Sequence, residues 1–403
     1  MRKRTVKEIE VTNKRVFLRV DFNVPMDQRG NITDDSRIKA CLPTIKYLLE
    51  NSAKLIICSH LGRPDGKIVE ELRLAPVADR LSKMLGRPVT ALTESTGPGV
   101  ENAVEVLGSG DILLLENIRF YPEEEANDDH FARSLAQLAD VFVNDAFGTS
   151  HRAHASVVGV ARYLPAVSGL LMEREIEALS DALENPRRPF AVVLGGAKVS
   201  GKIAVLENLM DKVDALLIGG GMAATFLKSE GYGVGSSRVE NDRLDYVRNL
   251  KKKATSRRIK LILPKDVIVA QQLETGVQTR IVPVDSIPDG WLIGDIGPET
   301  QDEFSNELRQ CQTVVWNSPP GVFEIPEFAG GTQSLIRTLA DLKVTSVIGG
   351  GSTAEAVIEM GLADRMSHVS TGGGASLEFL EGKTLPGVSI LQDKPVRARV
   401  AAR

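Results

Sequence analysis

The sequence predicts an α/β protein with two doubly wound parallel sheets, and three observations lead to this prediction. First, short runs rich in Val, Ile and Leu recur without strict alternation, as is typical of strands buried on both faces. Second, segments of helical composition, such as 199–210 and 353–360, lie between these runs, and such alternation indicates a parallel sheet. Third, the runs form two series along 403 residues, a length that favours two or three domains.

The individual strands are predicted from the apolar runs. In the first half they are residues 15–20, 54–58, 111–115 and 141–143, and in the second half residues 190–194, 215–218, 260–263, 313–316, 346–348 and 368–370. Residues 172–183 have the composition of a helix, and 185–189 (NPRRP) form a stop and turn after it. We therefore predict a first domain over 1–171 and a second over 172–385, which begins with the interdomain helix.

Composition and charge argue against several classes of protein. The chain has 49 Lys and Arg against 53 Asp and Glu, so its net charge of −4 does not suit nucleic acid as the main partner. The basic run over 248–260 has no interleaved aromatic residues and is interpreted as a solvated helix end. Cys41, Cys58 and Cys311 lie far apart, which indicates a reducing, cytoplasmic setting. We expect no secretory signal and no membrane span, because no apolar run approaches ~20 residues.

Glycine-rich turns follow the predicted strands of the second half. They comprise residues 195–196, 219–221, 349–351 and 372–374. Glycine lets the backbone approach a ligand closely, and the helix N-terminus that follows offers free N–H groups to an anion. Any one of these turns could be purely structural, but together they predict a site for a phosphate-rich ligand such as a nucleotide.

Two lysines, Lys198 and Lys202, lie one helical turn apart after the first of these turns. If residues 199–210 form a helix, both ammonium groups can lie on one face near its N-terminus. Two solvated lysines are the alternative. Residues 196–202 also match GxxxxGK, but Ile203 stands where a P-loop needs a Mg²⁺-binding Ser or Thr. A P-loop NTPase is therefore a disfavoured alternative.

Charged and hydrogen-bonding residues, rather than glycines, follow the predicted strands of the first half. If these strands are neighbours in one sheet, the side chains that converge are Arg37, His60, Arg63, Arg119 and Arg152. A concave cluster of Arg and His suits a small polyanion, since Arg binds phosphate and carboxylate through paired donors. Each Arg taken singly could instead form a surface salt bridge. His151 and His154 are interpreted as structural or substrate-directed rather than as zinc ligands, because Arg152 between them opposes a cation.

These observations predict one domain for a nucleotide and one for a small anion. The simplest reaction is phosphoryl transfer between them, with Lys, Arg and Mg²⁺ neutralising negative charge. There is no GxSxG nucleophile motif. An oxidoreductase is the weakest alternative, because no GxGxxG opens a helix after the first strand.

The motifs RVDFNVP (19–25) and SHLGRP (59–64) resemble those of the phosphoglycerate kinase family. The resemblance continues in order through LLLENIRF, FVNDAFGTSHRAHAS, LGGAKVS, IGGGMA, DIGPET, VIGGGST and VSTGGGASLEFLEGK. It implies two Rossmann-like domains joined by a hinge, with residues 386–403 packed on the first. It also implies a monomeric, cytoplasmic, glycolytic enzyme. That enzyme would move a phosphoryl group between 1,3-bisphosphoglycerate and MgADP, giving 3-phosphoglycerate and ATP, by direct in-line transfer with domain closure.

The same resemblance implies roles for individual residues. Those that would bind the phosphoglycerate are Asp21, Asn23, Arg37, His60, Arg63, Arg119 and Arg152. Those that would bind the nucleotide are Gly196, Lys198, Lys202, Gly220, Gly221, Asn317, Pro319, Val322, Glu324, Gly350, Gly351, Ser352 and Thr353. Those that would act on the transferring phosphoryl group are Arg37, Lys198, Gly373 and Gly374. No general base is needed, because a carboxylate acceptor is already ionised at neutral pH.

The chain departs from the family pattern at three places. Ser352 stands where the family has an Asp that helps to hold Mg²⁺, so the metal is expected on the nucleotide phosphates and water. Residues 318–320 (SPP) replace the usual GPx, and Gly201 replaces an Asp. None of these changes removes a phosphate-contacting Arg or Lys, so we expect an active enzyme. A nucleotide-binding homologue without turnover is the alternative.

Overall fold

The structure is a computed structural model that describes residues 2–395. Its contacts divide the chain into two compact units. Unit 1 comprises Met1–Glu177 with Thr384–Arg403, and unit 2 comprises Ala178–Lys383. The division falls inside α6 (Leu170–Glu184), which is the helix predicted over 172–183. Part of the predicted C-terminal segment, residues 396–403, lies outside the described residues.

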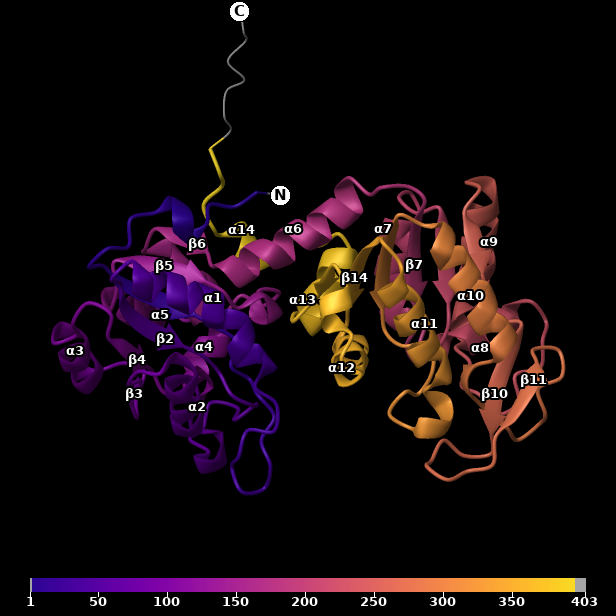
Figure 1. The fold of residues 1–403 in the computed structure, drawn as a ribbon, viewed down its shortest axis with the longest axis horizontal. Coiled ribbons are helices and arrows are strands. Elements are labelled where there is room, and N and C mark those ends of the chain that lie inside the picture. Colours follow the sequence, from indigo (N-terminus) through magenta and orange to yellow (C-terminus); the bar gives the residue numbers. More distant parts are fainter. Residues whose placement is uncertain (1, 396–403) are drawn as a thin grey trace, which may run out of the picture. The chain divides into compact units, whose positions relative to one another are not determined.

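Unit 1 is built on a six-stranded sheet whose strand pairs are all parallel. Its strands are β1 (Arg15–Arg19), β2 (Lys54–Cys58), β3 (Thr90–Ala91), β4 (Ile112–Leu114), β5 (Val141–Asn144) and β6 (Ala166–Ser168). Its helices besides α6 are α1 (Ser36–Glu50), α2 (Ala75–Leu85), α3 (Pro98–Glu105), α4 (Pro122–Ala126), α5 (Asp129–Gln137) and α14 (Pro386–Ser389). The strand order is β3-β4-β2-β1-β5-β6, so the chain adds strands on one side of β1 up to β3 and β4 and then continues on the other side with β5, which confirms a doubly wound sheet. Figure 1 shows the helices of unit 1 around this sheet.

Both faces of this sheet are buried, as the continuous apolar runs predicted. On one face Val16 and Leu18 of β1 belong to a core that includes Ile45 of α1 and Leu81 of α2. Successive strand residues point to opposite faces. Phe17, between Val16 and Leu18, therefore lies on the other face, where its ring centroid is 6.0 Å from that of Phe142.

The end of the described chain packs on unit 1. Helix α14 contacts the short helices η4 (Phe147–Thr149) and η5 (Ala155–Gly159). Asn144 Nδ2, at the end of β5, donates to the carbonyl oxygen of Gly387 at 3.0 Å. The Lys3 ammonium donates to the Leu391 carbonyl oxygen at 2.9 Å and to Asp393 Oδ1 at 2.7 Å. The last described residues are therefore held by the N-terminal residues before β1 and by the end of β5.

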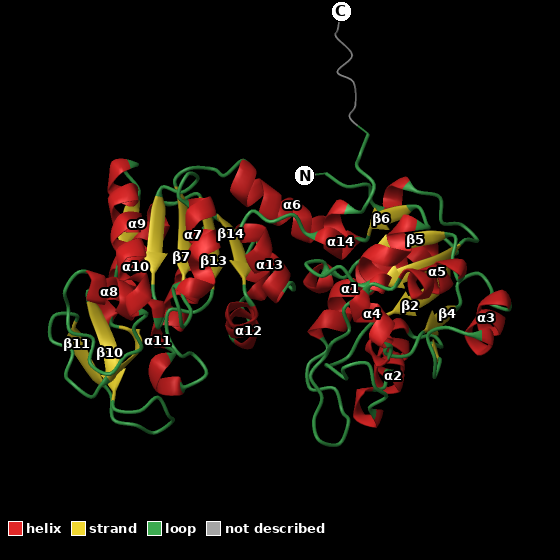
Figure 2. Cartoon of the chain, turned by 180° about the vertical axis from the view of Figure 1, so that it is seen from behind, coloured by secondary structure: helices red, strands yellow, loops and turns green. Residues whose placement is uncertain are grey.

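Unit 2 contains a second parallel six-stranded sheet, with the order β15-β14-β13-β7-β8-β9. Its strands are β7 (Phe190–Leu194), β8 (Ala215–Ile218), β9 (Lys260–Ile262), β13 (Thr313–Asn317), β14 (Thr345–Gly349) and β15 (His368–Val369). Its helices besides α6 are α7 (Ile203–Leu209), α8 (Met222–Ser229), α9 (Leu244–Ser256), α10 (Pro298–Gln310), α11 (Gly330–Asp341), α12 (Gly351–Glu359) and α13 (Gly373–Leu380). The order reverses between β7 and β13, and helices lie on both sides of the sheet (Figure 2).

An additional three-stranded antiparallel sheet in unit 2 was not predicted from the sequence. It has the order β11-β10-β12 and comprises β10 (Asp266–Ala270), β11 (Arg280–Pro283) and β12 (Leu292–Ile296). Three of the four residues of β11 are exposed, so this strand carries no buried apolar run. The sheet has its own small core, in which Val267 and Val269 pack with Leu227 of α8 and with Trp291.

No helix among residues 2–395 is long and apolar enough to cross a lipid bilayer.

Candidate functional site

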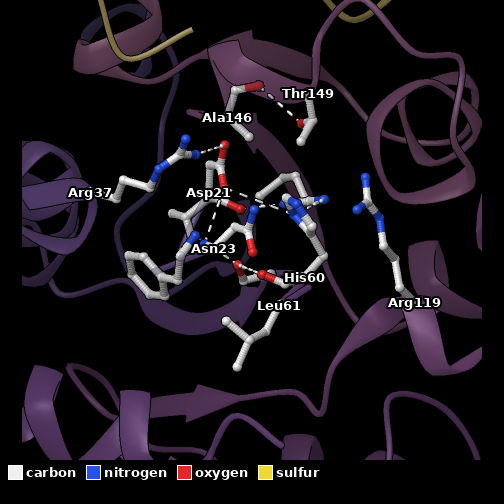
Figure 3. Close-up of polar contacts among 12 residues, drawn as sticks. Asp21, Asn23, Arg37, His60, Leu61, Arg119, Ala146 and Thr149 are labelled. Atoms are coloured by element: carbon white, nitrogen blue, oxygen red, sulfur yellow. Dashed lines mark hydrogen bonds and ion pairs between the residues drawn. The ribbon is translucent and has the colours of Figure 1, made fainter. Parts of the chain in front are cut away.

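Polar side chains of unit 1 gather where the strand order reverses, at the carboxyl ends of β1 and β5. Asp21 lies two residues after β1, and its Oδ2 accepts a hydrogen bond from Arg37 Nη1 at 2.6 Å. Arg37 comes from the first turn of α1. His60 follows β2, and its Nδ1 lies 3.9 Å from Asp21 Oδ1 (Figure 3). Asn23 Oδ1 accepts from the Gly62 N–H at 2.8 Å and so joins the loop after β2 to this group.

Two further predicted arginines lie beside this group. Arg119 is buried, and its Nη1 donates to the carbonyl oxygen of Gly62 at 3.0 Å. Arg152 is half-buried and its Nε lies 3.3 Å from His151 Nε2. Burial lowers the pKa of Arg119, and the positive charges of Arg19 and Arg152 lower it further. The structure therefore confirms that most of the predicted cluster converges.

Arg63 does not join the cluster through a direct contact. Its side chain is exposed and forms no hydrogen bond or ion pair within residues 2–395. Arg63 is thus free to turn toward a ligand or to remain in solvent.

Arg19 is a member of this site that sequence reasoning missed. It is the last residue of β1 and is fully buried. Its Nε donates to Ser156 Oγ at 2.8 Å, and its Nη2 lies 3.4 Å from His60 Nδ1. Ser156 in turn donates from Oγ and from N to the two carboxylate oxygens of the buried Glu124, at 2.6 and 2.8 Å. The available signal was a second arginine at the end of the strand RVFLR, directly after three apolar residues.

The electrostatics of the cluster favour an anion. Burial lowers the pKa of His60 well below its usual value, and the charges of Arg19, Arg119 and Arg37 add to this. Burial and the positive charges of Arg119, Arg19 and Arg152 lower the pKa of His154 to about 3. Burial opposes ionisation of Asp21, but the positive charges of Arg37 and Arg19 keep its pKa below the usual value. At neutral pH the histidines are uncharged and the arginines charged, so positive charge dominates the site.

In unit 2 the glycine-rich turns lie where they were predicted, each between a strand and a helix. At the reversal of the strand order, the Gly195 N–H donates to the Asn317 carbonyl oxygen at 3.1 Å. A Cβ on Gly195 would overlap the Pro319 carbonyl oxygen. The Gly220 N–H donates to the Pro320 carbonyl oxygen at 2.7 Å. These close backbone approaches join the loops after β7, β8 and β13 at one edge of the sheet.

The two predicted lysines do not share a helix face, which corrects the prediction made from their spacing. Residues Ser200–Lys202 form a 3₁₀ turn (η7), and α7 begins only at Ile203. Lys198 therefore lies before the helix and is exposed, whereas Lys202 is buried. Lys202 Nζ donates to Asn317 Oδ1 and, at 3.1 Å, to Ser318 Oγ. Burial lowers the pKa of Lys202 to about 8.

The first turn of α12 presents further polar groups next to this lysine. Gly350 caps the helix with a φ of +90°, a conformation that favours glycine. Asn317 Nδ2 and Thr353 Oγ1 are among the buried side-chain atoms of the described chain that have no hydrogen-bond partner. Ser352 is exposed on the same turn. A phosphate group can accept from such donors and from the free N–H groups of the helix N-terminus.

The remaining predicted nucleotide and catalytic residues border this loop region. Gly221 packs closely on Ala197, since a Cβ there would lie 3.1 Å from the Ala197 carbonyl oxygen. The Val322 N–H donates to the Gly294 carbonyl oxygen at 2.9 Å, while Glu324 is exposed. Gly373 and Gly374 form the first turn of α13, which follows β15 beside β14.

The sequence matches the phosphoglycerate kinase family model over residues 6–383. The chain belongs to the phosphoglycerate kinase family. The phosphoglycerate kinase of Pelotomaculum thermopropionicum is 56% identical over 394 residues, which cover 98% of this chain and 100% of the relative. That of Moorella thermoacetica is 54% identical over 394 residues, with the same coverage.

Solved structures agree with this family assignment. The structure of the phosphoglycerate kinase of Coxiella burnetii is similar with a TM-score of 0.86 and 44% identity, covering 96% of this chain and 98% of that chain. That of Pyrococcus horikoshii is similar with a TM-score of 0.84 and 35% identity, with the same coverage. Membership of the family confirms the prediction from the motifs and excludes the P-loop and oxidoreductase alternatives.

Proposed function

We propose that this protein is a glycolytic phosphoglycerate kinase, a phosphotransferase with a carboxyl group as acceptor. In the ATP-forming direction the bond between phosphorus and the carboxyl oxygen of 1,3-bisphosphoglycerate breaks. A bond forms from the same phosphorus to the terminal oxygen of ADP, and 3-phosphoglycerate leaves as a carboxylate. The observation that carries the proposal is the positively charged cluster of unit 1 in a chain of this family. In-line transfer with domain closure is part of the proposal, because water must be kept from the acyl phosphate.

Unit 1 is proposed to bind the phosphoglycerate. Arg119 and Arg152 carry the positive charge that suits its phosphate, and His60 and Asn23 offer hydrogen bonds. Asp21 holds Arg37 through the 2.6 Å contact, so that the guanidinium is fixed near the acyl group. A guanidinium binds phosphate or carboxylate through two parallel N–H donors, which fixes the orientation of the ligand as well as its position. Arg63 is proposed to join once an anion is present.

Unit 2 is proposed to bind the nucleotide. The loop glycines Gly220 and Gly221 pack closely on the backbone of Gly196 and Ala197. Together with Gly196, Pro319, Val322 and Glu324 they are proposed to border the base and ribose. Lys202, Asn317 and the first turn of α12 are proposed to hold the phosphates. Lys198 is proposed to stabilise the charge on the transferring group, with backbone N–H groups of Gly373 and Gly374. These groups act by position and charge, which is what phosphoryl transfer requires.

Magnesium is proposed to enter with the nucleotide. Within residues 2–395 no group of three or more His, Cys, Asp or Glu side chains is placed to hold a metal ion. The hydroxyl groups of Ser352 and Thr353 are neutral and are weaker Mg²⁺ ligands than a carboxylate. Nucleotide phosphates and water would therefore hold the ion, and it would neutralise phosphate charge. We further propose a cytoplasmic monomer that acts on small molecules, without a nucleic-acid or membrane partner.

Replacing Ser352 by Asp should tighten MgADP binding about three- to tenfold, because a carboxylate is a stronger ligand for Mg²⁺. Isothermal titration calorimetry with MgADP measures this. Ser352→Asn is the matched control, since it changes size without adding charge, and metal-free ADP should not gain affinity with either variant. An unchanged affinity of Ser352→Asp for MgADP would contradict the proposed place of the metal.

The free energy of unfolding should fall as pH is lowered from about 7 to about 5. Burial, with arginine charge, lowers the pKa of His154 to about 3 and also lowers that of His60, so the unfolded chain binds protons on both side chains in this range and the folded protein does not. Urea unfolding at a series of pH values measures the slope. His154→Asn should make the slope shallower, and an equal slope in both proteins counts against the lowered pKa of His154.

The proposed activity is tested by steady-state kinetics of the purified protein. With MgATP and 3-phosphoglycerate, ADP should form at roughly 1–1000 per second and only when both substrates are present. MgADP binding without turnover would instead support the nucleotide-binding homologue.

A further inference from the structure

Ser318 has an unfavourable backbone conformation directly after β13. Its φ is +71°, in the left-handed region where a residue with a Cβ is strained. The resemblance described above leads one to expect glycine at this position. The Ser318 carbonyl oxygen accepts a hydrogen bond from Trp316 Nε1 at 2.9 Å, and this bond needs no serine side chain. Any advantage of serine over glycine at this position must therefore come from the contacts of its hydroxyl group.

The Ser318 hydroxyl group closes a ring of hydrogen bonds with Lys202 and Asn317. Its Oγ accepts from Lys202 Nζ at 3.1 Å and donates to Asn317 Oδ1 at 3.3 Å. Lys202 Nζ also donates to Asn317 Oδ1. Lys202 is buried and forms no ion pair within residues 2–395, so its two side-chain acceptors are both neutral.

This ring fixes the orientation of the Lys202 ammonium group and of the Asn317 side-chain amide. A lysine ammonium has three N–H donors, and with two of them engaged the third remains for a ligand. Because Asn317 Oδ1 accepts from both neighbours, its Nδ2 points the other way. A Cβ on Gly349 or on Gly350 would lie 3.3 or 3.4 Å from that Nδ2. Asn317 is 1% exposed, and its Nδ2 has no hydrogen-bond partner in the described part of the chain.

We propose that Ser318 is a positioning residue, which holds the Lys202 ammonium and the Asn317 amide in place for one phosphate group of the nucleotide. This inference rests on the proposed function. A free lysine side chain loses much conformational freedom when it binds a phosphate, and holding it in place beforehand removes part of that cost. Both acceptors are neutral, and the Glu381 carboxylate, whose charge also acts on Lys202, is paired with Lys383, so Lys202 keeps its positive charge for the phosphate. Ser318 need not touch the nucleotide itself.

Two variants separate this role from a purely structural one. Ser318→Gly and Ser318→Ala both remove the hydroxyl group, but only glycine relieves the left-handed strain. We expect both to weaken MgADP binding about five- to tenfold, as loss of a hydrogen bond to a charged group predicts. Their melting temperatures should move apart, upward or unchanged for glycine and downward for alanine. The KM for MgADP should rise in both, with kcat within about twofold of the wild type. Ser286→Ala, in an exposed loop, is the control.

The outcomes of this experiment are distinguishable. If both variants bind MgADP within twofold of the wild type, the inference is wrong, while wild-type binding and turnover leave the proposed function intact. If only Ser318→Ala loses affinity, the effect follows strain rather than the hydroxyl group, and the positioning role is overturned. If the wild-type protein neither binds MgADP nor transfers a phosphoryl group, the proposed function fails first and the inference fails with it.

Discussion

Replacing Lys198 by Ala should lower kcat about 10²- to 10³-fold, the loss seen when a single group that stabilises transition-state charge is removed. Lys198 is exposed and precedes the 3₁₀ turn η7 (Ser200–Lys202), so its removal leaves no buried gap. The melting temperature should therefore stay within about 1 °C of the wild type, as for other exposed substitutions. The KM for 3-phosphoglycerate should also stay unchanged, because that ligand is proposed to bind unit 1. Stopped-time ADP assays at saturating substrates measure kcat.

Two further variants make this prediction specific. Lys252→Ala removes an exposed lysine from α9 and should leave kcat unchanged. Lys202→Ala should instead raise the KM for MgADP, because Lys202 is proposed to hold phosphates rather than the transferring group. A fall in kcat of less than fivefold for Lys198→Ala would show that the transition state does not depend on this ammonium group.

The strands of both sheets could be predicted closely, because a strand buried on both faces leaves a continuous apolar run. The run over 190–194 corresponds to β7 without change, and those over 54–58 and 215–218 to β2 and β8. Several strands were missed for different reasons. β6 (Ala166–Ser168) is buried but has only three residues, and β11 (Arg280–Pro283) is mostly exposed. β10 (Asp266–Ala270) was missed although four of its five residues are buried, so an apolar run alone was not sufficient to identify every strand.

The candidate site was predictable to the extent that strand ends share one edge of a parallel sheet. That rule correctly placed His60 and Arg119, which follow β2 and β4, at one edge, whereas Arg37 reaches the same place from the first turn of α1. It could not identify Arg19, whose partners Ser156 and Glu124 come from η5 and α4 and are set by packing. Spacing alone could not predict the positions of Lys198 and Lys202 either. The 3₁₀ turn at 200–202 puts Lys198 before the helix and exposed, and leaves Lys202 buried.

Replacing Arg19 by Met should both destabilise the protein and weaken substrate binding. The substitution removes a fully buried cation and leaves the Glu124 carboxylate buried without its compensating charge. Breaking a buried charged network in this way costs about 3 kcal/mol of unfolding free energy. The KM for 3-phosphoglycerate should rise at least tenfold, because His60 and the neighbouring arginines lose a fixed positive charge beside them. Urea unfolding and steady-state kinetics measure the two effects.

The double variant Arg19→Met with Glu124→Gln separates the two effects, because it removes the unpaired carboxylate together with the cation. Its unfolding free energy should recover by more than about 1 kcal/mol relative to Arg19→Met alone, as expected for coupled neighbours. Its KM for 3-phosphoglycerate should stay high, because no positive charge has been restored. Arg15→Met, at the other end of β1, removes a partly exposed arginine paired with Asp140 and should cost less than about 1 kcal/mol. If both the unfolding free energy and the KM recover in the double variant, Arg19 acts only on the fold. A residue that supplies positive charge to the substrate site could not be replaced by the two neutral side chains of the double variant without a loss of binding.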